Sequence, residues 1–331
     1  MTDINTAYDR IIGSLIGFAL GDAVGAAERA GFTFPHSEPI KGYPVADWTV
    51  HTDHLILSYL CASQRDGGDA ADTNTALTNR IEYQRIMAAL LNNWREHGLK
   101  ECGDNSGHGL SSSMSLIICD PDFLTNPEAV ADKIGKQSGG NFTSNIGLLR
   151  ACVANPDEKH CIEHADMVCS VSHSDSKCVS SAIIMAMLIH GIAFTNNTAS
   201  EVLVNAIAAA ARASRLDPGL SDILQAAFQG RIHDLDLSNV GKAFHVYKCL
   251  SAAVYALHVI DVAERNNKIP SFRKVIERIA SCGGEADANC AAAGSLLGAY
   301  LGKKKLPLDW VSSLPHTIDF NDDGYLVLNA Q

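Results

Sequence analysis

The chain has 331 residues, of which 47% are hydrophobic and 19% charged, an ordinary balance for a protein that buries a large core. Its net charge of −11, without a basic stripe, argues against a nucleic-acid partner and favours solubility at high concentration. With no apolar run of about 18 residues and no leader sequence, we expect no membrane partner, a cytoplasmic location and ten free thiols.

The N-terminal half is expected to be helical. Residues 4 to 28 have the apolar periodicity of a long helix, and glycines recur along it at every fourth position from Gly13 to Gly25. Three prolines make residues 31 to 48 an extended loop. Further helices are predicted at 53–64, 79–96, 111–119 and 127–136.

The C-terminal half continues this pattern. Gly294, Gly298 and Gly302 again share one helical face, and we expect this face to pack closely against the first glycine stripe. Strand signals are nearly absent, and residues 325–328 are the best candidate. The remaining helices are predicted at 175–195, 199–214, 242–266 and 271–282. The fold class is therefore all-α, with one domain over residues 1–331.

Two acids, Glu285 and Asp287, stand at the entrance of the last glycine-rich helix. A pair of carboxylates in such a place could hold a hard metal ion, provided that another segment brings further ligands. The candidate partner is the loop-to-helix junction at residues 47–54, where Thr52 or Asp53 is the expected N-cap.

Five segments, in order along nearly the whole chain, resemble the ADP-ribosylglycohydrolase family. The first is Gly-Phe-Ala-Leu-Gly-Asp-Ala-Val-Gly, and the last is the Gly-Gly-Glu-Ala-Asp stretch that opens the glycine-rich helix. The segments lie at 17–25, 32–49, 145–150, 172–179 and 283–302. The resemblance implies an orthogonal all-α helical bundle forming a single domain.

The resemblance also implies two magnesium ions between two acidic junctions, where they bind ADP-ribose and help to cleave its bond to a protein side chain. The first junction is Trp-Thr-Asp-Asp-Thr in the family, and here both acids are replaced, by Val50 and His51. The second is Asp-x-Asp-Thr, and here the hydroxyl is lost. Three relict metal positions remain, which we expect to be unoccupied: Thr49, Glu285 and Asp287.

Other departures concern the ligand pocket that the resemblance implies. Arg29 occupies the place of an acid, and Ile146 replaces a glycine next to Asn145. Asn145, His173 and Gly109 are the positions expected to line a relict pocket, although His173 could equally be a loop histidine at the start of a helix. Without metal, the two acids at 285 and 287 would repel each other, so we expect a raised pKa or an unexpected cation there.

These losses affect the chemistry and leave the scaffold intact. The same pattern is found in the J-type lens crystallins of jellyfish, which resemble this family and which this chain resembles in turn. We therefore predict a non-catalytic structural protein, an eye-lens crystallin, without a cofactor and with weak self-association. One alternative is a hydrolase with an atypical or single metal held by Thr49, His51, Glu285 and Asp287, with magnesium as the ion if any site survives. The other is a module that binds ADP-ribose.

Overall fold

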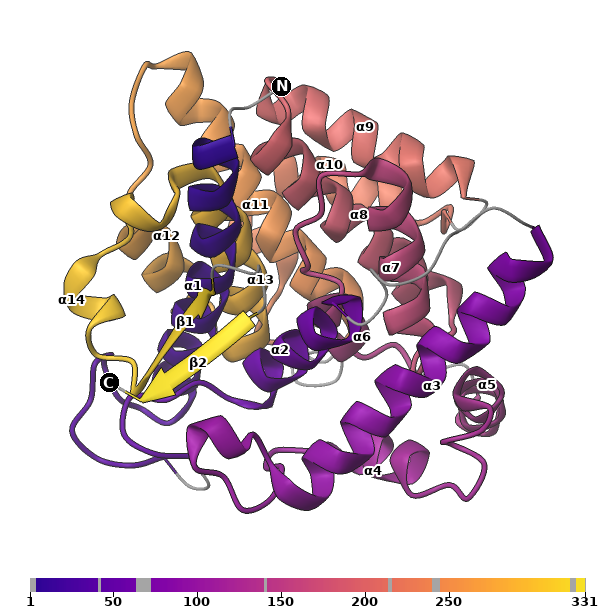
Figure 1. Cartoon of the computed structure of the whole chain (residues 1–331). Helices are drawn as coiled ribbons and strands as arrows, with labels where there is room; N and C mark the ends of the chain where they lie inside the picture. The colour runs from indigo at the N-terminus through magenta and orange to yellow at the C-terminus, as the bar shows by residue number, and fades with distance from the viewer. Residues whose placement is uncertain are drawn as a thin grey trace.

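The centre of the fold is a pair of helices, α1 (Ile4–Arg29) and α13 (Ala286–Leu301), which lie side by side in Figure 1. A Cβ atom added to Gly17 would come within 3.0 Å of the Gly294 carbonyl oxygen, and one on Gly298 would do the same to that of Gly13. Only glycine at these positions lets the two backbones approach so closely. The predicted contact between the two glycine stripes is confirmed.

The computed structural model describes residues 4–40, 43–63, 73–139, 142–213, 216–239, 245–321 and 326–330. In addition to α1 and α13, the helices are α2 (Val50–Ser63), α3 (Thr73–His97), α4 (Ser112–Ile118), α5 (Pro127–Gln137), α6 (Ile146–Arg150), α7 (Glu158–Ser170), α8 (Ser176–Phe194), α9 (Ala199–Arg212), α10 (Leu220–Phe228), α11 (Val246–Arg265), α12 (Phe272–Ala280) and α14 (Leu308–Val311). The strands are β1 (His316–Phe320) and β2 (Leu326–Ala330). The predicted all-α class is confirmed.

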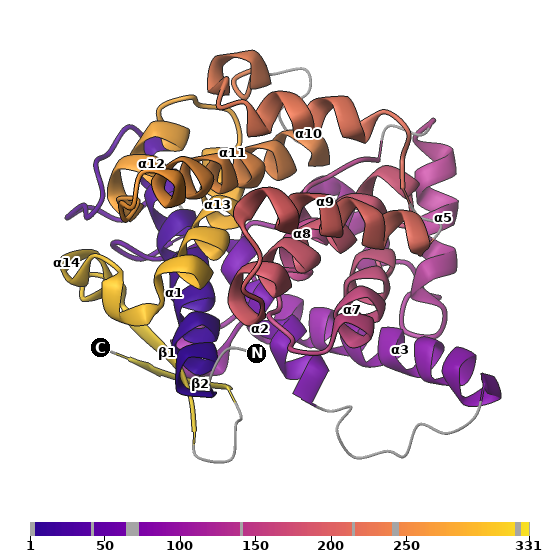
Figure 2. The ribbon, with the colours of Figure 1, turned by 90° about the horizontal axis from the view of Figure 1, so that it is seen from above.

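The other helices surround the central pair. Helices α11 and α12 pack against α13, and α8 contacts both central helices while α7 and α9 pack against α8 (Figure 2). The strands β1 and β2 pair antiparallel, with Ile318 opposite Leu328, and β1 contacts α1. Helix α3 crosses one side of the molecule together with α4 and α5 (Figure 1).

The second helix departs from the sequence-based prediction. It begins at Val50, so the prediction of Thr52 or Asp53 as N-cap was wrong, and both residues lie in its first turn. The carboxylate of Asp22, on α1, accepts hydrogen bonds from the backbone N–H groups of Thr49 and Thr52, both at 3.0 Å. An acceptor from a different helix thus satisfies two of the backbone N–H groups at this helix end.

Some elements were not predicted from the sequence, namely the helices α6, α7, α10 and α14 and the strand β1. The strand predicted at 325–328 corresponds to β2, although residue 325 itself lies outside the described residues. Helices α1, α8 and α11 are long and apolar enough to cross a membrane by length and composition. However, 89%, 83% and 72% of their apolar windows are buried inside the fold, because these helices supply much of the core.

Candidate functional site

A cavity of about 600 Å³ opens where the C-terminal end of α1 meets the N-terminal ends of α2 and α13. The sequence predicted three relict metal positions and three pocket positions. Five of these six residues line the cavity, namely Thr49, Gly109, Asn145, Glu285 and Asp287. The fold thus brings together positions that are up to 238 residues apart, because the two central helices place their ends on the same side of the molecule.

The sixth residue, His173, is not among the lining residues. It is buried, its Nδ1 lies 2.8 Å from the Ser172 hydroxyl, and its ring stacks on Phe142 at a centroid distance of 4.8 Å. Burial and the nearby Arg150 lower the pKa of His173 to about 3, so the ring is neutral. Asp175 caps α8 by accepting from the N–H of Lys177, so His173 is not the capping residue.

Arg29, the last residue of α1, supplies a cation to the two acids. Its Nη1 lies 3.1 Å from Glu285 Oε2 and 2.5 Å from Asp287 Oδ2, and its side chain is 39% exposed while each acid is 9% exposed. The Nε2 atom of His51 lies 3.7 Å from the same Asp287 oxygen. The expectation of an unexpected cation beside this acid pair is confirmed.

The electrostatics of the two acids differ. Burial disfavours the Asp287 carboxylate, but the His51 ring and the Arg29 guanidinium outweigh that cost and lower the pKa of Asp287 to about 2. Burial and the neighbouring charge of Asp287 raise the pKa of Glu285 despite its contact with Arg29. For His51, burial lowers the pKa, and its contact with Asp287 more than reverses that effect and raises it.

Thr49 is engaged in a separate network. Its hydroxyl donates to Asp22 Oδ1 at 2.7 Å, and its oxygen lies 3.4 Å from the backbone nitrogen of His51. The hydroxyl of Thr52 donates to the other Asp22 oxygen at 2.7 Å. Asp22 is fully buried, and this burial raises its pKa although the two threonines stabilise the charged form.

This donor set does not fit a pair of magnesium ions. Magnesium requires a nearly octahedral shell of oxygen ligands. Here the two remaining carboxylates are paired with Arg29 and His51, the Thr49 hydroxyl is bonded to Asp22, and the Val50 side chain offers no ligand. Within the described residues, no group of three or more His, Cys, Asp and Glu side chains is arranged to hold a metal ion.

A buried arginine lies behind the cavity wall. Arg150 is fully buried, its Nε donates to the Val168 carbonyl at 3.0 Å, and a second nitrogen donates to the Ser172 hydroxyl. Burial lowers the pKa of Arg150 to about 10. Its Nη1 lies 3.4 Å from Nδ1 of His54, and burial together with this guanidinium lowers the pKa of His54 well below its ordinary value. His54, which lines the cavity, is therefore neutral.

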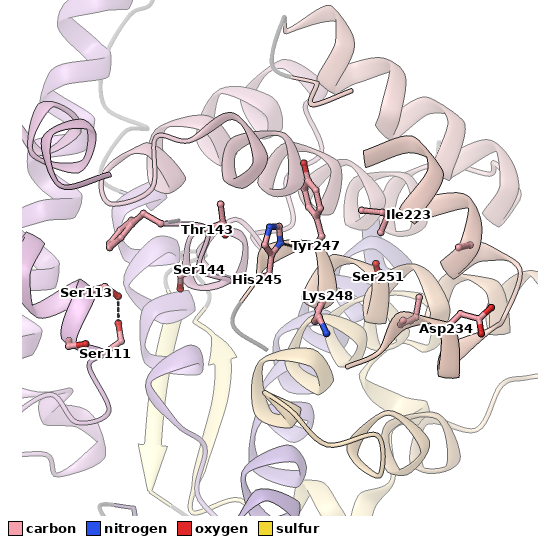
Figure 3. A pocket seen from close by; sticks show the side chains of 14 residues that line it. Ser111, Ser113, Thr143, Ser144, Ile223, Asp234, His245, Tyr247, Lys248 and Ser251 are labelled. Atoms are coloured by element: carbon pink, nitrogen blue, oxygen red, sulfur yellow. Dashed lines mark hydrogen bonds between the residues drawn. The ribbon is translucent and has the colours of Figure 1, made fainter. Parts of the chain in front are cut away.

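A second cavity, of about 870 Å³, adjoins the first and shares Ser111, Ser112 and Ser144 with it. Figure 3 shows the hydroxyls of Ser111 and Ser113, 2.9 Å apart, on one side and Tyr247 on the other. The loop before α6 is held to α11 because the backbone N–H of Val246 donates to the Thr143 carbonyl at 2.8 Å.

This second cavity was not predicted from the sequence. Its lining comes from five separate stretches of the chain between Ser111 and Ser251. The start of α11, with His245, Tyr247 and Lys248, was predicted only as part of a long apolar helix. The one available signal was the run of three serines at 111–113 after a glycine-rich loop.

Comparisons with known proteins agree with this architecture. The family model described as ADP-ribosylglycohydrolase matches residues 3–329. Among 44 matching chains of solved structures is one described as an ADP-ribosylglycohydrolase-related protein complex, with a TM-score of 0.60 and 18% identity over 94% of each chain. That likeness concerns the fold alone. No curated protein matches this sequence.

Proposed function

Because the chain belongs to the ADP-ribosylglycohydrolase family, we propose that it is a non-catalytic member of that family with a structural role. The observation that carries this proposal is the contact of the Arg29 guanidinium with both Glu285 and Asp287. The resemblance implies that hydrolysis needs magnesium between the two junctions. Here the second junction already has its positive charges, and they belong to the protein.

The first junction supports the same conclusion. A magnesium ion at α2 would need anionic oxygens, whereas the side chains at the start of this helix are an apolar valine and a histidine drawn toward Asp287. Without a metal there is no Lewis acid to lower the pKa of an attacking water or to clamp ribose hydroxyls. A hydrolase with a single metal at Thr49, His51, Glu285 and Asp287 would first have to displace Arg29.

The structural role that we propose is that of a soluble bulk protein of the cytoplasm, similar to the J-type lens crystallins. The chain has lost ligands of the metal site that the family resemblance implies, but it has kept the scaffold. The glycine contact between α1 and α13 and the core around it are intact. The net charge of −11 favours solubility at high concentration and limits self-association to weak contacts. Such a role needs neither a cofactor nor a nucleic-acid or membrane partner.

A second candidate function is the binding of ADP-ribose without cleavage. The observation that favours it is the 870 Å³ cavity, which continues into the smaller one through Ser111, Ser112 and Ser144. Its hydroxyls and the aromatic ring of Tyr247 are groups that could contact a sugar and a base.

The test is a hydrolysis assay on the full chain with peptides ADP-ribosylated on arginine or serine, with excess magnesium or with EDTA. We expect no release of ADP-ribose above the blank in either condition. Magnesium-dependent turnover would overturn the non-catalytic assignment, and turnover in EDTA would indicate a metal-free hydrolase. In parallel, a rise in the unfolding temperature with ADP-ribose would favour the binding module, and its absence the structural role. Bulk abundance in lens tissue is the result expected for a crystallin.

A further inference from the structure

We propose that Arg29 is a built-in counter-ion that takes the place of a divalent cation between α1 and α13, so that removing its guanidinium makes the protein's stability depend on magnesium. This inference rests on the proposed loss of metal-dependent chemistry and deepens it. The protein stays folded with two buried carboxylates because Arg29 compensates their charge.

The position of Arg29 follows from the glycine stripe of α1. The glycines at 13, 17, 21 and 25 are four residues apart, and Arg29 is the next position of that series, on the face that α13 packs against. One turn earlier, a Cβ atom on Gly25 would come within 3.0 Å of the Ala286 carbonyl and the Asp287 nitrogen. The close approach of the two backbones therefore brings the side chain at 29 to the acids at 285 and 287.

The turn before α13 places the two acids beside each other. The turn before α13 contains two glycines with positive φ, Gly283 at 72° and Gly284 at 70°. A Cβ atom on Gly284 would overlap the carbonyl oxygen of Leu237, so this turn is packed against a neighbouring segment. Both acids lie at the wall of the cavity, and each residue is more than 90% buried.

The charges then require a cation. Two carboxylates held together and away from water are costly unless opposite charge compensates them. A guanidinium is always charged and can bridge two acids through one nitrogen, as Nη1 does here at 3.1 and 2.5 Å. If Arg29 is removed, the cationic partner left to the acids among the described residues is His51, at 3.7 Å from Asp287. A small divalent cation with carboxylate and water ligands can then take the place of the guanidinium.

The experiment compares thermal unfolding of the wild type and of Arg29→Ala in EDTA and in excess magnesium. The wild type should unfold at the same temperature in both. In EDTA Arg29→Ala should unfold several degrees lower, and magnesium should restore most of the loss. Arg29→Lys keeps a cation and should be insensitive to magnesium. If Arg29→Ala fails to fold in EDTA, the proposal can still be tested with Arg29→Lys. In that case Arg29→Ala is expected to refold when magnesium is added.

Arg80 provides a matched control. It also bridges two acids, Glu128 and Asp166, both at 3.1 Å, but these do not line the cavity. Arg80→Ala should lose stability without recovery by magnesium. The proposal is overturned if Arg29→Ala does not respond to magnesium, if Arg80→Ala responds equally, or if the wild type itself depends on magnesium. None of these outcomes requires turnover, so they are distinct from a failure of the non-catalytic assignment.

Discussion

Replacing Gly25 by alanine tests whether the contact between α1 and α13 sets the geometry of the site. An added Cβ atom would lie within 3.0 Å of three backbone atoms, the carbon and oxygen of Ala286 and the nitrogen of Asp287. Ordinary contacts begin at 3.4 Å, and neither backbone can rotate out of the way as a side chain could. Because these three atoms would lie only 2.3 to 2.4 Å from the added Cβ, the end of α1 must move away from the start of α13 by up to about 1 Å. This movement lengthens the contact of Arg29 with Asp287.

Two effects of opposite sign decide how much Gly25→Ala changes the free energy of unfolding. Alanine in place of a helical glycine gains about 1 kcal/mol of helix stability. Forcing an extra carbon into a close-packed contact costs about 1–3 kcal/mol, and the upper part of that range applies because the neighbours are backbone atoms. We expect a net loss of about 1–2 kcal/mol in the free energy of unfolding, measured by urea denaturation followed by circular dichroism.

The control is Gly135→Ala in α5, where nothing lies within 4 Å of an added Cβ atom. Only the helix propensity acts there, so this variant should be more stable than the wild type by up to about 1 kcal/mol. A Gly25→Ala protein that matched Gly135→Ala in stability would refute the claim that this contact is closed to any side chain.

Two further predictions concern the site. The folded-state pKa of about 2 for Asp287 lies below its ordinary value of 3.8, so its charge stabilises the fold above about pH 4 and that stabilisation is lost as the pH falls toward 2. The lowered pKa corresponds to roughly 2 kcal/mol of stabilisation. The Asp287→Asn variant should therefore flatten the plot of unfolding free energy against pH between about pH 4 and 2. An unchanged slope would contradict the lowered pKa of Asp287. For metal binding, the triple variant Val50→Asp, His51→Asp, Ala288→Thr should still bind no magnesium by calorimetry, and adding Arg29→Glu should create binding. Binding by the triple variant would contradict the role given to Arg29.

The sequence by itself determined the helical architecture and the pairing of its two central helices. A glycine at every fourth position has few explanations other than the close approach of another backbone, and two such stripes in one chain predict each other. It also determined that the start of α2 lacks the carboxylates of the family pattern, since Val50 and His51 can be read directly.

Tertiary structure alone decided how the remaining charges are paired. Arg29 is 256 residues away from Glu285, and only the packing of α1 on α13 brings the two side chains together. The same holds for Asp22, which caps a helix that starts 28 residues later and displaces the expected local cap. Hydrophobic periodicity does not predict such partners, because it shows only which face of a single helix is buried.

The burial of His173 and the larger cavity were decided in the same way. His173 lies beside a polar, turn-like sequence, yet it packs against Phe142 and Ser172 behind the cavity wall. The walls of the cavity in Figure 3 come from five stretches of loop and helix that lie between Ser111 and Ser251. Helix periodicity fixes which face of a segment is buried, whereas the space left between segments depends on how every one of them is placed.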